Sequence, residues 1–170
     1  MFDINWITHK VVPGLPRGLK HAVRYAPRFP LNRSLQSALN YILAPQIEQQ
    51  ELDFMFGRSV AVIVQDLDLH LRIERNESGL VVEANTTPLS VQNADVTLTG
   101  DFFAFSLLIT QQVDPDTLFF RRRLRMTGDT ELGLHVKNLL DTVELHTRLP
   151  SLTQSWVKSF GEKVQAYSTQ

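Results

Sequence analysis

The segment Leu67-Asp68-Leu69-His70-Leu71-Arg72-Ile73-Glu74 alternates apolar and polar residues along its whole length. A period of two is that of a β-strand with one face buried and the other in water. The next stretch, Asn76-Glu77-Ser78-Gly79, has the composition of a turn. Residues 80–85 are therefore expected to return as the antiparallel partner of a hairpin. This hairpin predicts a fold that contains an antiparallel sheet.

The remaining elements are short, and most of them have a clear boundary in the sequence. In chain order we predict a helix from Asn32 that Pro45 kinks or restarts, strands over 60–64 and 94–99, a helix over Phe102–Ile109, a short helix or turn after Asp114, a strand over 121–127, a helix after Asp129, and a last amphipathic helix over Ser151–Tyr167. Strands joined in a run, with the helices gathered elsewhere, predict an α+β layer fold and not a βαβ nucleotide-binding fold.

Length and composition are those of one globular domain. The chain has 170 residues, of which 43% are hydrophobic and 21% charged, a formal net charge of -1 and no cysteine. These values exclude a disulfide framework, thiolate metal sites and a cysteine nucleophile, and they give no case for nucleic-acid binding. The longest uncharged runs, Ser34–Ile47 and Phe102–Val113, are too short to span a membrane. We divide the chain into a Pro-rich lead-in (1–31), a central domain (32–147) and a C-terminal helix (148–170).

The lead-in is basic. No acidic residue occurs between Ile4 and Ile47, and cations alternate there with aromatic and aliphatic residues. This pattern suits an anionic lipid headgroup layer. We predict membrane or headgroup contacts at Arg17, Lys20, Arg24, Arg28, Arg122, Trp156 and Phe160. The alternative is a solvated lead-in that wraps the domain.

Residues that could carry catalysis are few. None of the five histidines has metal-ligand spacing, and no nucleophile elbow or phosphate-binding loop occurs. The carboxylate pairs Asp66/Asp68 and Asp114/Asp116 lie at turns, where Asp is common. We therefore predict no catalytic residue, no metal and no cofactor, with a small carboxylate-based enzyme as the rival.

The densest charge cluster comprises Arg121, Arg122, Arg123 and Arg125. One interpretation is capture of an anion or phospholipid headgroup. The other is cross-strand pairing on the outer sheet face. Arg122 shares parity with Leu124 and is therefore expected either on the core side, where it would need an anion, or at the end of the strand.

Two helices carry more apolar surface than one sheet can cover. The helix at 102–109 is apolar on all sides, and the helix after Asp129 has Leu134 opposite its main apolar stripe. Such helices are buried on two sides or line a cavity, although ordinary core packing is the alternative. We predict a lipid-binding wall made of Phe102, Phe103, Phe105, Leu108, Ile109, Phe119, Phe120, Leu124, Met126, Leu132, Val136, Leu139 and Leu140.

Two motifs carry a family resemblance. They are Asp114-Pro115-Asp116-Thr117-Leu118-Phe119-Phe120-Arg121-Arg122-Arg123-Leu124 and Gly128-Asp129-Thr130-Glu131-Leu132-Gly133-Leu134. With Glu51-Leu52-Asp53-Phe54 and Gly57-Arg58 upstream, they resemble the UbiT (YhbT-like) group of bacterial proteins, which is built on the sterol-carrier-protein lipid-binding domain. The broad domain covers about residues 38–145.

The resemblance implies a mostly antiparallel five-stranded sheet covered by helices that enclose an apolar tunnel. It implies a non-catalytic accessory factor of oxygen-independent ubiquinone biosynthesis, which binds prenylated quinone precursors and works with the hydroxylase proteins UbiU and UbiV. The expected location is the bacterial cytoplasm, with peripheral association with the inner membrane. A phospholipid-binding membrane-docking scaffold is the alternative function.

Overall fold

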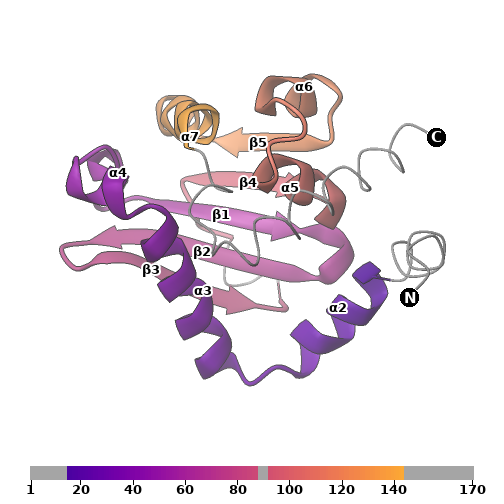
Figure 1. Cartoon of the computed structure of the whole chain (residues 1–170). Coiled ribbons are helices and arrows are strands. Elements are labelled where there is room, and N and C mark those ends of the chain that lie inside the picture. The colour runs from indigo at the N-terminus through magenta and orange to yellow at the C-terminus, as the bar shows by residue number, and fades with distance from the viewer. Residues whose placement is uncertain (1–14, 88–91, 144–170) are drawn as a thin grey trace, which may run out of the picture.

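The computed structural model describes residues 15–87 and 92–143, and side chains from Gly18 onward (Figure 1). The elements follow one another as α2 (Leu15–Tyr25), α3 (Arg28–Ile42), α4 (Ala44–Glu48), the 3-10 turn η1 (Asp53–Met55), β1 (Ser59–Val64), the 3-10 turn η2 (Gln65–Leu67), β2 (Leu69–Asn76), β3 (Gly79–Asn85), β4 (Val96–Gly100), α5 (Phe102–Ile109), α6 (Pro115–Phe120), β5 (Leu124–Gly128) and α7 (Thr130–Thr142). The predicted C-terminal helix, with Trp156 and Phe160, lies outside the described residues.

The strands form one sheet in the order β3-β2-β1-β4-β5. Neighbouring strands are antiparallel except for β1 and β4, which run parallel. The β2–β3 hairpin has the predicted register, with Asn76 opposite Gly79, and Gly79 adopts the positive φ of +135° that this turn requires. The predicted α+β class and mostly antiparallel five-stranded sheet are confirmed.

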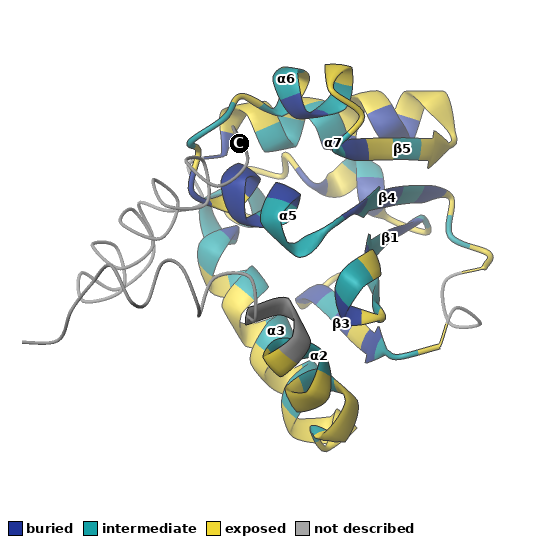
Figure 2. Ribbon diagram, turned by 90° about the vertical axis from the view of Figure 1, so that its right-hand side faces the viewer, coloured by how far each residue is buried: buried dark blue, intermediate teal, exposed yellow. Residues whose placement is uncertain are grey.

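The two faces of the sheet differ in chemistry because the strand period is two. One face, the apolar sheet face, carries Arg75 at one end, opposite Leu80, and is otherwise formed by Val60, Val62, Val64, Leu69, Leu71, Ile73, Leu80, Val82, Ala84, Val96, Leu98, Leu124 and Met126. The opposite face carries mainly polar residues such as Arg72, Glu83 and Thr97. Residues from the end of α3 to α7 pack on the apolar sheet face, so the core lies on that side. The buried residues of α5, α6 and α7 are dark blue in Figure 2.

Helix α3 covers the outer edge of the sheet by means of polar side chains. Asn32, Gln36 and Asn40, spaced four residues apart, accept hydrogen bonds from the backbone N–H groups of Ala84, Val82 and Leu80 at 2.9, 3.5 and 2.8 Å. Alternate N–H groups of an edge strand point outward at about the spacing of successive helical turns. The helix therefore occupies an edge that would otherwise be open to pairing with another chain.

Asn40→Ala should lower the free energy of unfolding by about 2 kcal/mol. Asn40 also donates to the Leu80 carbonyl at 2.7 Å and to the Gln36 carbonyl of its own helix at 2.8 Å. The variant therefore removes both hydrogen bonds to the strand edge and leaves part-buried backbone groups of Leu80 without a partner. Chemical denaturation measures the change, with Ser37→Ala on the exposed side of α3 as the control. Equal stabilities of the two variants would show that the edge contact contributes nothing.

The observed boundaries of three elements can be compared with those predicted from the sequence. Helix α3 begins at Arg28 and not at Asn32, because Pro30 lies in its first turn, where no intrahelical N–H donor is needed. Strand β2 begins at Leu69 because Asp68 adopts a left-handed conformation with φ of 50°. Pro45 separates α3 from α4, as predicted.

The prediction for Arg121–Arg123 was wrong. Strand β5 begins at Leu124, and the three arginines form the turn after α6, in which Arg122 has φ of 57°. The backbone N–H groups of Arg122 and Arg123 donate to the carbonyls of Phe119 and Leu118 and close this turn. Arg122 is exposed and not on the core side, so it needs no buried anion.

Candidate functional site: the apolar sheet face

The centre of the apolar sheet face is less covered than its flanks. Val62, Leu69, Leu71 and Ile73, which we call the central patch, are only half-buried. On one side of it, Leu80, Val82 and Ala84 of β3 are 2–3% exposed, and on the other side Val96 and Leu98 of β4 are 0% and 3% exposed. Central strands normally bury such a face completely. The central patch is therefore apolar surface with room for further apolar contact.

Two clusters of helical and strand side chains border the central patch. The first cluster joins Val60, Leu80 and Val96 to buried residues before β1 and in or after α7, namely Leu43, Leu52, Met55, Leu132, Val136 and Val143. The second joins Leu98 and Leu124 to Ala104, Leu107, Leu108 and Leu118 of α5 and α6. Met126 and Leu140 pack against both clusters, so the two meet at the β5–α7 side.

Most of the predicted lipid-binding residues lie in or against these clusters. Leu108, Leu124, Leu132 and Val136 are buried members, and Phe103, Phe105, Phe119, Met126, Leu139 and Leu140 are half-buried and pack against them. Phe102 is half-buried, with its ring 5.7 Å from that of Phe103. Ile109 and Phe120 are 42% and 90% exposed and belong to neither cluster. The structure thus gathers eleven of the thirteen residues around one region, counted as the four buried, the six half-buried and Phe102.

The central patch is not among the residues predicted from the sequence. Leu69, Leu71 and Ile73 alternate with polar residues in β2, and alternation by itself predicts a strand without saying how well its apolar face is covered. Once β1 and β2 are paired, Val62 lies opposite Leu71 on the same face. The sequence signal that could have identified the patch is the alternation of side chains along each strand, combined with the predicted hairpin.

A groove of about 350 Å³ lies outside the core, between α6, β5 and the start of α7. Phe119, Met126, Gly133 and Leu134 supply its apolar lining and Lys137 its cation. Gly133 has no side chain, so the Met126 sulfur packs close to the helix there. Leu134, predicted to face away from the main stripe of α7, is 58% exposed beside this groove. The volume is at the lower limit of small-molecule sites.

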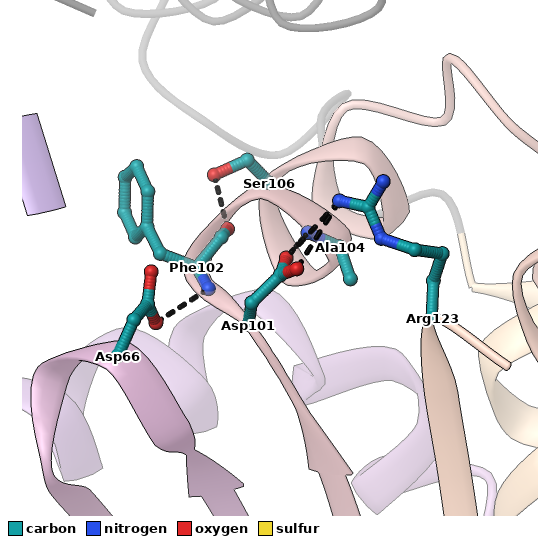
Figure 3. Close-up of polar contacts among 6 residues, drawn as sticks. All are labelled: Asp66, Asp101, Phe102, Ala104, Ser106 and Arg123. Carbon is teal, nitrogen blue, oxygen red and sulfur yellow. Dashed lines mark hydrogen bonds and ion pairs between the residues drawn. The ribbon is translucent and has the colours of Figure 1, made fainter. Parts of the chain in front are cut away.

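Polar contacts fix α5 above the sheet (Figure 3). Asp101 caps the helix by accepting a hydrogen bond from the Ala104 N–H at 2.6 Å, and Arg123 Nη2 donates to both Asp101 oxygens at 3.2 and 3.3 Å. Asp66 of η2 accepts from the Phe102 N–H at 2.8 Å. An apolar helix contributes few polar contacts from its own sides, so its N-terminus determines how it is attached.

Asp101→Ala should lower the free energy of unfolding by about 1–2 kcal/mol through loss of the α5 cap. Arg123, which is about one-third exposed, adds little to this because water screens the pair. Thermal denaturation measures the effect, and Asp114→Ala, which removes the cap of the shorter helix α6, serves as the matched control. A smaller effect at Asp101 than at Asp114 would contradict the importance of the α5 attachment.

The four carboxylates considered for catalysis each have a structural partner. Asp66 binds α5, and Asp114 caps α6 by accepting from the Asp116 N–H. Asp68 pairs with Lys20 at 2.5 Å, a hydrogen bond that lowers the pKa of Asp68. Asp116 pairs with Lys137 at 2.8 Å and raises the pKa of that lysine. Neither sequence pair therefore acts as two neighbouring carboxyl groups that share a proton.

Residues 15–87 and 92–143 contain no group of three or more His, Asp or Glu side chains that could hold a metal ion. Within the same ranges no helix is both long and apolar enough to cross a bilayer.

Comparison with known proteins decides the family. Residues 39–141 match the SCP-2 sterol transfer family. The chain belongs to this family. Within it, the chain is 35% identical over 152 residues to the ubiquinone biosynthesis accessory factor UbiT of Escherichia coli K12, a match that covers 89% of this chain and 83% of UbiT. UbiT of Escherichia coli O157:H7 matches equally. The predicted resemblance to the UbiT group is thus confirmed.

A solved SCP-2 structure agrees with the fold. The protein described as "UbiJ-SCP2 Ubiquinone synthesis protein" superposes with a TM-score of 0.54 and 20% identity over 70% of this chain and 96% of that chain. At this identity the likeness concerns the fold alone. The sheet-and-helix architecture of this chain is therefore shared with that protein.

Proposed function

We propose that this protein is a non-catalytic lipid-binding accessory factor of ubiquinone biosynthesis. It holds the prenyl tail of quinone intermediates against the apolar sheet face and presents their head groups to modifying enzymes. The observation that carries the proposal is the central patch, a row of half-buried apolar side chains in the middle of the sheet between two buried clusters. The names of the UbiT relatives supply the pathway.

The energetics of the tail explain why a carrier is needed. Removing a prenyl tail from water is favourable by about 0.8 kcal/mol per buried carbon, so about 20 carbons contribute about 16 kcal/mol before the costs of ordering. A molecule with such a tail stays in a bilayer unless a protein offers comparable apolar surface. Patch residues such as Val62 and Leu71, together with Phe103 and Phe105, offer surface of this kind.

The absence of a catalytic role is part of the proposal. Its support is that Asp66, Asp68, Asp114 and Asp116 are each engaged in a cap or an ion pair. Chemical modification of the quinone head group is then the task of separate enzymes. We propose UbiU and UbiV as those partners, in the oxygen-independent branch of the pathway, in the bacterial cytoplasm and at the inner membrane.

The presence of a prenyl tail should decide the affinity of the protein for a ligand. Native mass spectrometry of the full chain with an octaprenyl phenol and with unprenylated phenol tests this directly. We expect a one-to-one complex with the prenylated molecule and none with phenol, because the apolar sheet face contacts the tail. Equal binding of the two compounds would mean that the protein recognises the head group and would refute the proposal.

A further inference from the structure

We propose that the α2–α3 elbow, residues 24–29, is a docking surface for an anionic phospholipid bilayer. The elbow joins α2 to α3 beyond the edge of the sheet, at the end of the molecule opposite α6 and α7 (Figure 1). The proposal does not depend on the bound quinone, since it concerns how the protein contacts a membrane.

Two aromatic side chains at the elbow are almost fully in water. Tyr25 is 78% exposed and Phe29 is 77% exposed, and only Ala26, Pro27 and Arg28 separate them. Among the described residues, only Phe120 is a more exposed large hydrophobic side chain. Aromatic rings are favoured at the interface between water and lipid, where their apolar body is covered and a polar tip stays wet. The elbow thus offers two anchors of the appropriate chemistry.

The charge around these anchors is positive. Arg24 and Arg28 flank Tyr25, Arg33 follows in α3, and all three are exposed. None of the three forms an ion pair with another described residue. Neither α2 nor α3 contains an acidic residue. The surface therefore complements an anionic headgroup layer. Two helices that only faced water would have no reason to lack acidic residues.

One acidic group lies close to the elbow. Asp68 pairs with Lys20, and Arg24 and His70 also lower its pKa. The pair neutralises Lys20, so the net positive charge of the surface comes from the arginines. Arg24 and Arg28 are for this reason the residues that we assign to headgroup contact.

The elbow also adjoins one end of the apolar sheet face. A small recess behind it is lined by Arg24, Arg28 and Leu31 together with Leu69 and Ala84, which belong to that face. A second recess of about 330 Å³ is lined by Lys20, Arg24, Leu67, Asp68, Thr86 and Thr87. Leu69 is itself a member of the central patch and lies next to Leu71 on the same face of β2. A bilayer docked at the elbow would therefore lie next to the end of the lipid-binding surface.

Flotation of the full chain with vesicles tests the proposal. The probes are vesicles of phosphatidylcholine alone and vesicles that also contain phosphatidylglycerol, both without quinone. We expect binding to the anionic vesicles that weakens in high salt. Arg24→Gln with Arg28→Gln should reduce the partition coefficient about fivefold for each arginine, hence about 25-fold together. Tyr25→Ser with Phe29→Ser should also reduce it.

Matched controls use similar side chains elsewhere. Tyr41→Ser removes a 63% exposed aromatic at the far end of α3, and Arg125→Gln removes an exposed cation of β5. Both should bind vesicles like the wild type, and circular dichroism should show all variants folded, since every changed side chain is exposed.

Several outcomes overturn the proposal. They are no vesicle binding, equal binding to neutral and anionic vesicles, or unchanged binding by both elbow double variants. Concentration-dependent association of the wild type that Tyr25→Ser with Phe29→Ser abolishes, without vesicle binding, would instead make the elbow an interface between two copies. Binding of the prenylated phenol by the elbow variants, measured separately, distinguishes failure of this proposal from failure of the lipid-binding proposal.

Discussion

Leu71→Glu should lower the affinity for a prenylated ligand by about a hundredfold or more. Leu71 lies in the central patch, opposite Val62 on one side and Ala84 on the other. A carboxylate there would lose its water when the tail binds. Arg75, the cation on the same face, lies four residues further along β2 and pairs with Asp53, so it would not compensate the new charge. Because Leu71 is only half-buried, the free protein can keep the new charge in contact with water and stay folded.

The control for Leu71→Glu lies on the other side of the same sheet. Val81 is half-buried on the polar face of β3, opposite Glu74. Val81→Glu should therefore bind the ligand like the wild type, while thermal denaturation shows how much each variant loses in stability. Equal losses of affinity in both variants would mean that the tail does not lie on the apolar sheet face.

Gly128→Ala should lower the free energy of unfolding by about 3 kcal/mol or more, and the variant chain is expected to fold poorly. Gly128 ends β5 with φ of +113°, and a Cβ there would lie 2.1 Å from the carbonyl oxygen of Asp95. That oxygen accepts a hydrogen bond from Asp129 N–H at 2.8 Å, so neither backbone segment can move without losing it. The strain of a positive φ in alanine adds to the cost of the steric clash with Asp95.

Gly57→Ala separates the two effects. Gly57 also has a positive φ, +70°, but no other atom lies within 4 Å of the place that a Cβ would occupy. The substitution carries only the backbone cost of about 1–2 kcal/mol. Chemical denaturation of both variants measures the difference, and equal losses would show that the close approach of Asp95 to Gly128 is not important.

The sequence predicted correctly those helices and strands whose positions are marked by nearby residues, such as a turn or a helix cap. The alternation in residues 67–74 and the turn at Gly79 fix the hairpin, because a shift of one residue would reverse every side chain. Asp101 and Asp129 mark the starts of α5 and α7 and indeed cap them. The parallel pairing of β1 with β4 has no such signal, since it joins strands far apart in the chain.

The errors have equally local causes. Three successive arginines have no periodicity, so only the hydrogen bonds of the α6 turn show where β5 begins. Pro30 looks like a barrier to helix formation, although the first turn of a helix accepts proline. Asn32, Gln36 and Asn40 give no warning of their role, because polar residues at helical spacing ordinarily face water, whereas here they cover a strand edge.

The candidate site was predicted in part for a similar reason. An all-apolar helix indicates that most of its side chains are covered, and α5 fits this with four buried residues, Ala104, Ser106, Leu107 and Leu108. Successive helical residues turn by about 100°, so not all of them can face inward. Ile109 and Phe120, each the last residue of its helix, are the ones left exposed. Only the paired strands reveal the central patch itself.

The central claim is that the apolar sheet face holds a prenylated tail, and mass spectrometry of organic extracts tests it most directly. Wild-type protein and the Leu71→Glu variant are purified from the same bacterial host, and their extracts are compared. We expect a prenylated quinone or its precursor in the wild-type extract and its loss from the variant. An extract of wild-type protein with no prenylated molecule above the level of the variant would contradict the claim.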